Sequence, residues 1–287
     1  MSHTQKAMFS GIVVFLSIAL SYVLFGSLFF HLIDTWKIDP FYLHGPWIAV
    51  ASFFLYLRFL WLHRESQLLR LRTKDIVSAI VFLVFSALFF LFGIQTKMPF
   101  LGGLAFALWG VALHSLLFGS KEGCLPVMEY SFPFFYFLFA VPLPYLSEAS
   151  GLLQLFIAKL STNIFSGLGY PIRQEGINLI LPHASFQIAP DCTGIKSWLV
   201  LFSLVVFFLT FIRLKFCFKI LISFLIVPVA FFSNMFRIIV LLLLGFHKDE
   251  KIALAFWHDF SGITFYGVAC FLTLLMVWAL IRYDRTT

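Results

Sequence analysis

Residues 188–198, with the sequence IAPDCTGIKSW, place the thiol of Cys192 beside an acid, a hydroxyl and a glycine, directly before a long apolar run. At the start of a helix, free backbone N–H groups and the helix dipole favour a thiolate over a thiol. None of the other three cysteines, Cys124, Cys217 and Cys270, is expected at the same membrane depth, so a disulfide is not expected. Cys192 is therefore a candidate nucleophile. The alternative is a small cysteine that only fills space in a membrane protein.

Two further polar residues lie where a membrane makes them costly. Arg237 is inside an apolar run, where a charge costs about 2.5 to 3.5 kcal/mol on the mildest scale. Asn234, three residues earlier, shares its helix face and is expected to orient the guanidinium. His258 begins the next apolar run, level with Cys192. The alternatives are an arginine that stabilises the bundle and a histidine that is only solvated; three other histidines are expected on the same side: His44, His183 and His247.

Together, these residue types suit covalent catalysis at one membrane depth. The thiolate of Cys192 would attack a carbonyl, and His258 would carry the proton. Arg237 would stabilise the thiolate or the developing oxyanion. The elements that position these three side chains are membrane helices.

Composition identifies an integral membrane protein. The chain has 287 residues, of which 61% are hydrophobic and only 11% charged, including 40 Phe. Its mean hydropathy of +0.99 is far above that of a water-soluble globular domain of this length. Apolar runs of about bilayer-spanning length recur along the chain, which predicts an all-α polytopic bundle. We expect a single membrane domain over residues 1–287, with four spans in 1–120 and a catalytic half in 125–281.

Windows of about 20 residues predict about eight transmembrane helices. The first run is too long for the core of a signal peptide and is expected to remain as a helix. The fifth carries Glu129, Pro133, Pro142 and Pro144, so we expect it to be broken or kinked. The predicted spans are 8–32, 41–62, 76–95, 100–119, 125–146, 192–212, 219–245 and 258–281.

The distribution of Lys and Arg predicts orientation. With a cytoplasmic N-terminus, eleven of the 20 basic residues fall on the inner side and seven on the outer side. Basic residues concentrate in cytoplasmic loops, so both termini are expected in the cytoplasm and the candidate site on the extracytoplasmic face. The net charge of +7 arises from these loops, and nucleic-acid binding is not expected.

The only long segment between spans, 147–191, is expected outside the cell membrane. Its first half has apolar residues at helical spacing, which predicts an interfacial amphipathic helix; they are Leu152, Leu153, Phe156, Leu160 and Ile164. Its second half, GINLILPHASFQIA, has two short β-like runs around residues 182–184, which predict a small hairpin. This extracytoplasmic helix and hairpin lie between the fifth and sixth spans and lead to Cys192.

These motifs resemble those of the exosortase/archaeosortase family of membrane-embedded cysteine transpeptidases. The family pattern is C-[ST]-G-I at a helix start, N-x-x-R in the next span, and a His followed four residues later by Gly. This sequence has Cys192-Thr193-Gly194-Ile195, Asn234-Met235-Phe236-Arg237, and His258 with Gly262, in that order. The resemblance covers about residues 130–270, and the first four spans resemble the family only in hydrophobicity.

The resemblance implies a catalytic triad of Cys192, Arg237 and His258, supported by Thr193, Gly194 and Asn234. It implies an intramembrane cysteine protease and transpeptidase in the cell (inner) membrane that needs no cofactor or metal. Its partners would be exported proteins with a C-terminal sorting signal: a motif, a transmembrane helix and a basic tail. Cleavage would give a thioester, and an acceptor, expected to be a membrane lipid, would take the protein. No role is assigned to Asp191.

Other classes of membrane protein are alternatives. In a transporter or channel, Arg237, Asn234 and His258 would line a polar pathway and Cys192 would be incidental. A rhomboid-type serine protease is disfavoured because neither IFSGLG nor DFSGIT supplies a Gly-x-Ser-Gly run. A metalloprotease of the His-Glu-x-x-His type is disfavoured because that motif does not occur.

Overall fold

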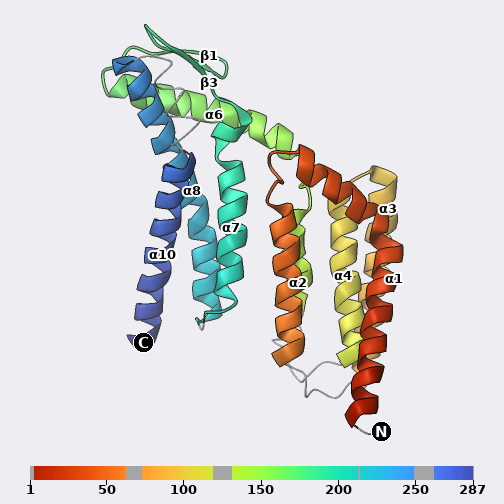
Figure 1. Ribbon diagram of the computed structural model, residues 1–287. Coiled ribbons are helices and arrows are strands. Elements are labelled where there is room, and N and C mark those ends of the chain that lie inside the picture. The colour runs from red at the N-terminus through yellow and green to blue at the C-terminus, as the bar shows by residue number, and fades with distance from the viewer. Residues whose placement is uncertain (1–2, 63–72, 119–130, 213, 249–261, 287) are drawn as a thin grey trace. The chain divides into compact units, whose positions relative to one another are not determined.

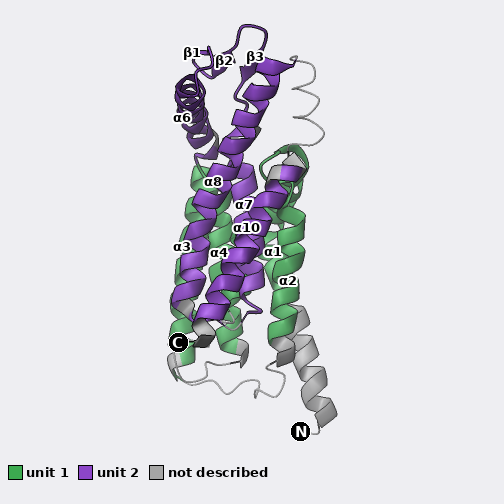
Figure 2. Cartoon of the chain, turned by 90° about the vertical axis from the view of Figure 1, so that its left-hand side faces the viewer, with its two compact units in different colours: residues 1–144 green, residues 145–287 purple. Residues whose placement is uncertain are grey.

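The computed structural model describes residues 3–62, 73–118, 131–212, 214–248 and 262–286. The chain divides into two compact units, Met1–Pro144 and Tyr145–Thr287 (Figure 2). The single membrane domain expected for the whole chain stays a prediction.

The described residues are mostly helical, as predicted. The first unit contains α1 (His3–Ile38), α2 (Gly45–Leu62), α3 (Thr73–Thr96), α4 (Pro99–Phe118) and the 3-10 helix η1 (Phe137–Ala140). The second unit contains α6 (Leu146–Gly167), the 3-10 helix η2 (Pro190–Thr193), α7 (Ile195–Leu209), α8 (Phe216–His247) and α10 (Gly262–Thr286). It also holds the strands β1 (Arg173–Glu175), β2 (Asn178–Ile180) and β3 (Ser185–Gln187) (Figure 1).

Five helices of the described residues are long and apolar enough to cross a membrane. They contain the segments Ala19–Ile38, Asp75–Thr96, Pro99–Leu116, Cys217–His247 and Tyr266–Tyr283. Three shorter apolar helices, Gly45–Phe59, Ser131–Ala140 and Ile195–Leu209, fall within the other three predicted spans. At 1.5 Å per residue, the last of these is about 22 Å long, less than the roughly 30 Å of a bilayer core. A membrane protein is therefore confirmed, and the count of eight spans stays a prediction.

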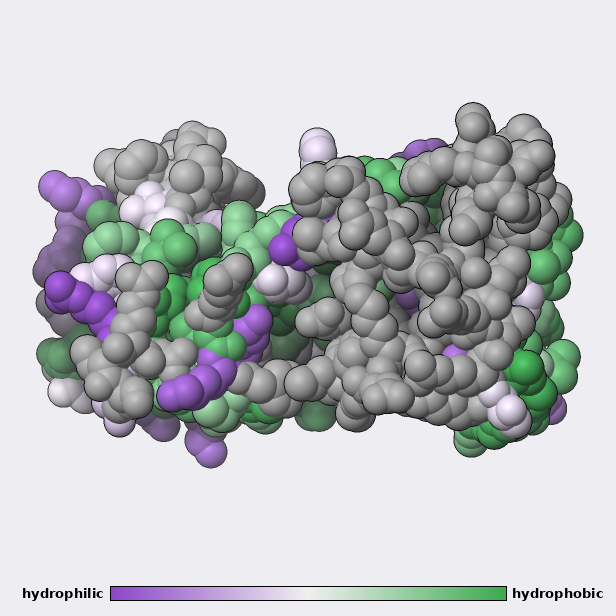
Figure 3. Space-filling model, turned by 90° about the horizontal axis from the view of Figure 1, so that it is seen from below, coloured by the Kyte–Doolittle hydropathy of each residue, from purple (hydrophilic) through white to green (hydrophobic). Residues whose placement is uncertain are grey.

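Large apolar side chains on the surface agree with a membrane environment. Val23, Trp47 and Phe224 are each more than 70% exposed. Hydrophobic residues form much of the coloured surface in the view of Figure 3. Apolar surface on this scale is unusual for a soluble monomer and ordinary for helices that face lipid.

The predicted fifth span is interrupted just before Pro142 and Pro144. Its described part turns from α-helix to the 3-10 helix η1, and Val141 follows in an extended conformation at φ −99° and ψ 132°. A residue before proline is driven out of the helical region by the proline ring. Pro142 therefore explains why the helix ends there.

Edge-to-face aromatic contacts pack the first unit. The rings of Phe25 and Phe29 each contact Phe106, with centroids 5.5 and 5.2 Å apart, and Phe106 contacts Phe137 at 5.3 Å. Such pairs stabilise by about 0.5 to 1.5 kcal/mol beyond the burial of their area. Part of the high phenylalanine content is thus used for contacts between α1, α4 and η1.

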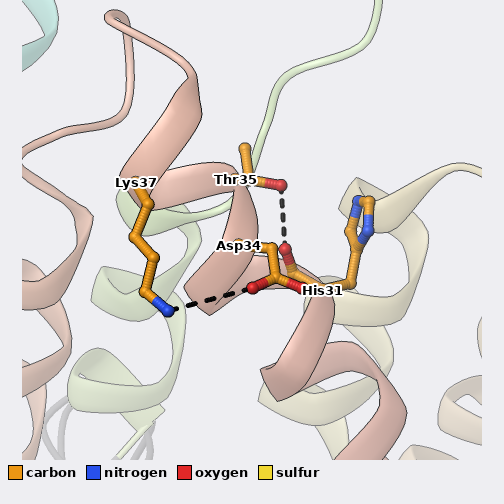
Figure 4. A network of polar contacts seen from close by, with 4 residues as sticks. All are labelled: His31, Asp34, Thr35 and Lys37. Atoms are coloured by element: carbon orange, nitrogen blue, oxygen red, sulfur yellow. Dashed lines mark hydrogen bonds and ion pairs between the residues drawn. The ribbon is translucent and has the colours of Figure 1, made fainter.

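The first helix continues past the end of its predicted span at residue 32. In its last turns, the Thr35 hydroxyl donates to the His31 carbonyl at 2.9 Å, and Lys37 lies 4.0 Å from Asp34 (Figure 4). Both side chains of the ion pair are more than 70% exposed, so the pair contributes about 0 to 1 kcal/mol. The apolar run therefore underestimated the length of the helix, because its end is polar.

In the second unit, α6 and the sheet lie beyond one end of α7 and α10 and pack beside the C-terminal part of α8, where Phe186 meets Gly245 (Figure 1). The sheet is antiparallel with the order β1-β2-β3. The hairpin predicted around residues 182–184 is confirmed as β2 and β3, with Leu179 opposite Phe186. The strand β1 was not predicted, because its sequence RQE has no apolar alternation. Gly176, at φ +61°, makes the turn that joins it to β2.

The helix α6 confirms the predicted helix in the first half of the long segment. Its fully buried face differs from the predicted apolar stripe and consists of Ser150, Ile157, Ala158, Ser161 and Phe165. Leu152 and Phe156 are 72% and 54% exposed. Small residues on the buried face let helices approach closely, which hydrophobic spacing alone does not predict.

Candidate functional site at Cys192

Cys192 lies in the 3-10 turn η2, three residues before α7 begins at Ile195. Its N–H donates to the Ala189 carbonyl at 2.8 Å. The hydroxyl of Thr193 donates to the Pro190 carbonyl at 2.7 Å and closes the same turn. The sequence predicted a membrane span that begins at residue 192. In the structure, the helix begins at Ile195, so Cys192 precedes the helix and is not part of its first turn.

Gly194 joins this turn to α7 in a conformation that other residues rarely adopt. Its φ is +79°, in the left-handed region. A Cβ atom at this position would lie 3.1 Å from the Cβ of Asn234 in α8. Glycine is therefore needed for the backbone angle and for the close approach of α8.

The side chain of Asn234 holds the backbone of Cys192. Its amide nitrogen donates to the Cys192 carbonyl at 2.7 Å, and the residue is only 6% exposed. The hydrogen bond of its amide nitrogen fixes the cysteine turn, and the expected orientation of Arg237 by Asn234 stays a prediction. This bond connects the C-T-G-I and N-x-x-R segments across 42 residues.

A second side chain holds the chain just before the turn. The amide of Gln154, in α6, donates to the Ile188 carbonyl at 2.7 Å. Sequence reasoning missed this contact, because Gln154 gives no signal beyond being a polar residue on an amphipathic helix. The segment that carries Cys192 is thus bonded to α6 on one side of the turn and to α8 at the turn itself.

Cys192 is part of the wall of a cavity between the sheet and α8. The residue is 4% exposed overall, and the cavity has a volume of about 210 Å³. Most of its lining is apolar, and the residues are Leu179, Ser185, Phe186, Gln187, Ile188, Cys192, Ile238, Leu241 and Leu242. A small apolar group beside the thiol would fit this space. No sequence signal indicated the cavity.

Arg237 lines a different and much smaller pocket, between α7, α8 and α10. Its volume is about 20 Å³, and its lining residues are Ser197, Leu201, Ala230, Ser233, Asn234, Arg237, Tyr266 and Ala269. Asn234 lines this pocket and also bonds to Cys192, which lines the larger cavity. Ser197, Ser233 and Tyr266 are polar neighbours that sequence reasoning did not single out.

The third predicted catalytic residue, His258, lies outside the described residues, which resume at Gly262. The expectation that Cys192, Arg237 and His258 converge on one pocket therefore stays a prediction.

The described residues show thiols at Cys192, Cys217 and Cys270. Within the same ranges, no cluster of three or more His, Cys, Asp or Glu side chains could hold a metal ion. The chemistry that the described site offers directly is that of a buried thiol, amide and hydroxyl groups, and a guanidinium.

A protein-family comparison matches the model of the transmembrane exosortase (Exosortase_EpsH) over residues 36–275. This chain belongs to the transmembrane exosortase family. The matched range contains Cys192, Asn234, Arg237 and His258, and it starts before α2, so the match reaches into the first unit as well. The exosortase resemblance was expected to start near residue 130, and that boundary was wrong. No curated protein and no solved structure matches the chain.

Proposed function

We propose that this exosortase family member is a cysteine transpeptidase that removes the C-terminal sorting signals of exported proteins. The observation that carries the proposal is the buried Cys192 turn. Its carbonyl is held by Asn234, and the residue lines a cavity with room for part of a substrate. A transporter does not require a rigidly held cysteine turn beside a cavity, and the family match does not favour that alternative.

The first half of the reaction is acyl transfer to the enzyme. The sulfur of Cys192 attacks the carbonyl carbon of the scissile peptide bond and forms a tetrahedral oxyanion. The C–N bond then breaks, and the leaving amine takes a proton from His258. The sorting signal departs with a new amino terminus, and the exported protein remains attached as a thioester.

The second half returns the thiolate. An amine on the acceptor attacks the thioester carbonyl, the C–S bond breaks, and a new amide forms. His258 takes the proton that the amine loses, which restores the starting state. We propose a membrane lipid as the acceptor, and neither half of the reaction requires a metal or cofactor.

The remaining residues act on charge and position. Arg237, three residues from Asn234 on α8, supplies the positive charge for the thiolate or the oxyanion. Thr193 and Gly194 shape the turn, and Asn234 fixes the Cys192 carbonyl. The accurate placement of Cys192 by this turn matters because misplacing a reacting group by about 1 Å can reduce a rate about 100-fold.

The proposed location is the cell (inner) membrane, with both termini in the cytoplasm and the site at the outer face. The basic residues of the short loops support this orientation. A nucleophile at the membrane surface suits a substrate with a recognition motif, one transmembrane helix and a basic tail, because the cut falls beside that helix.

The test is tail retention in cells that produce exported proteins with C-terminal tags. Cys192→Ala and Cys192→Ser are both expected to leave the tails in place, whereas Cys217→Ser, at an exposed cysteine, is expected to process them normally. A transporter predicts that Cys192→Ser keeps full function, since the two side chains are nearly isosteric. Normal processing by Cys192→Ser at matched protein levels would contradict the proposed function.

A further inference from the structure

The strand β3 leads the chain into the Cys192 turn and lies at one edge of the described sheet. Hydrogen bonds join the pairs Leu181–Ala184 and Ile177–Ile188, at 2.8 and 2.9 Å. Bonded and non-bonded pairs alternate in an antiparallel ladder, so Phe186 also pairs with Leu179. The backbone N–H and C=O groups of Ser185 and Gln187 therefore point away from β2, along the outer edge of β3.

This edge borders the cavity beside the thiol. Ser185, Gln187 and Cys192 are all among the residues that line it. The side chain of Phe186 points to the opposite face from those of Ser185 and Gln187 and packs against Gly245 of α8. Both Ser185 and Gln187 are exposed, so their outward backbone groups are accessible beside the apolar cavity.

The size and lining of the cavity restrict what it can hold. Its volume of about 210 Å³ is below the roughly 300 to 1,000 Å³ of sites for drug-sized molecules. Its lining contains five Leu and Ile side chains and one Phe, with no charged residue. It therefore suits one or two apolar side chains of a larger substrate, whose backbone stays outside.

We infer that the protein substrate binds as an extended strand along the outer edge of β3 and inserts an apolar side chain into the cavity beside Cys192. Backbone pairing at a sheet edge supplies affinity, and a pocket for alternate side chains supplies specificity. The occupant is a peptide because the edge offers paired donors and acceptors at strand spacing, and because this edge and the thiol line the same cavity. The inference rests on the proposed function, since it places the scissile bond at the sulfur of Cys192.

The probes are short tagged peptides that end in a vinyl sulfone, which labels a thiolate. They react with the full-length protein in detergent micelles, and labelling of Cys192 is followed by mass spectrometry. A probe with Leu next to the vinyl sulfone is expected to react about tenfold faster or more than one with Asp. Methylation of the backbone nitrogens that face β3 is expected to slow labelling roughly threefold to tenfold.

Matched variants test the cavity and the outer edge of β3 separately. Leu241→Trp fills the cavity and is expected to slow the Leu probe, whereas Phe236→Trp, at a position 62% exposed on the same helix, is not. Ser185→Pro removes an outward N–H from β3 and is expected to slow every peptide probe. The control, Gln174→Pro, removes an outward N–H from β1 at the opposite edge of the sheet. Iodoacetamide labelling of Cys192 checks in each variant that the site is intact.

The outcomes separate the inference from the proposed function. Rapid labelling of Cys192 by iodoacetamide, with no effect of peptide side chain or backbone methylation, would overturn the inference and leave the nucleophile in place. Faster labelling by a vinyl sulfone with a plain alkyl chain than by any peptide would assign the cavity to lipid and overturn it too. Absence of labelling by every reagent would contradict both.

Discussion

The two units differ in where the hydrogen bonds of their polar side chains end. In the first unit, the Ser86 hydroxyl and the Trp36 indole donate to carbonyls 19 and 104 residues away, at Ala105 in α4 and Ala140 in η1, and aromatic rings pack between helices. In the second unit, the amides of Gln154 and Asn234 donate to backbone that is 34 and 42 residues away in the chain. Both of these bonds end on the segment around Cys192. These two bonds of the second unit thus converge on one turn, whereas the two bonds of the first unit end on different elements.

This difference indicates which contacts hold their atoms most accurately in place. Aromatic contacts in the first unit tolerate small shifts, because dispersion and edge-to-face geometry vary smoothly with distance. Short hydrogen bonds from buried amides are more restrictive, and a missing partner costs about 1 to 3 kcal/mol. Substitutions around Cys192 should therefore reduce activity first, whereas those in the aromatic core should reduce stability first.

The largest expected effect beyond the nucleophile itself is that of Gly194→Ala. A Cβ atom there would press against Asn234, and the left-handed backbone would add strain of about 1 to 2 kcal/mol. Because both changes move Cys192, we expect tail removal to fall about 100-fold, measured as the rate of substrate processing. Gly169→Ala is the control, since Gly169 has a φ of +88° with open space around it. Equal losses of activity in the two variants would mean that contact with Asn234 is unimportant.

Asn234→Ala is expected to have the next largest effect. It leaves the buried Cys192 carbonyl without its amide donor, at a cost of about 1 to 3 kcal/mol. If that cost falls on the reactive geometry, processing slows roughly 5-fold to 150-fold. The rate of iodoacetamide labelling at Cys192 measures the change at the thiol directly. Asn163→Ala, at an exposed position on α6, is the comparison, and an unchanged labelling rate in Asn234→Ala would refute the positioning role.

In the first unit, Gly110→Leu should lower stability and leave the chemistry of the folded protein unchanged. A side chain at Gly110 would collide with the ring of Phe134. Overpacking of this kind typically costs about 1 to 3 kcal/mol, measured by unfolding in detergent micelles. Gly26→Leu, where the space is open, is the matched control. Slower labelling of Cys192 in the folded fraction of Gly110→Leu would break the contrast between the units.

The smallest effect concerns Tyr42, in the turn between α1 and α2. Burial raises the pKa of Tyr42 to about 12, a hydrogen bond from the Leu143 N–H to its oxygen opposes this, and Asp39 raises the pKa further. The neutral hydroxyl therefore contributes stability below pH 10 that is lost as the pH rises toward 12, on the order of 2 kcal/mol at most. Tyr42→Phe should show a weaker loss of stability over that pH range. An identical alkaline loss in both proteins would contradict the assignment.

The sequence could predict the parts of the site that depend on local pattern. A polar turn before an apolar run located Cys192 near a helix start, and alternation around residues 182–184 located β2 and β3. Contacts between distant segments were not predictable in this way. Gln154 and Asn234 are polar residues on helices, and only the packing of α6 and α8 decides which backbone carbonyl each one meets. The cavity could not be predicted from the sequence either, because it is a gap between side chains of the sheet and α8.

The central claim is that Cys192 forms a thioester with an exported protein. The most direct measurement is mass spectrometry of the full-length enzyme, quenched in acid during turnover of a tagged exported protein. The account predicts a peptide containing Cys192 that carries the substrate's new carboxyl end through sulfur, and hydroxylamine should release it. Substrate attached through another residue, or normal turnover with no adduct in Cys192→Ala, would contradict the account.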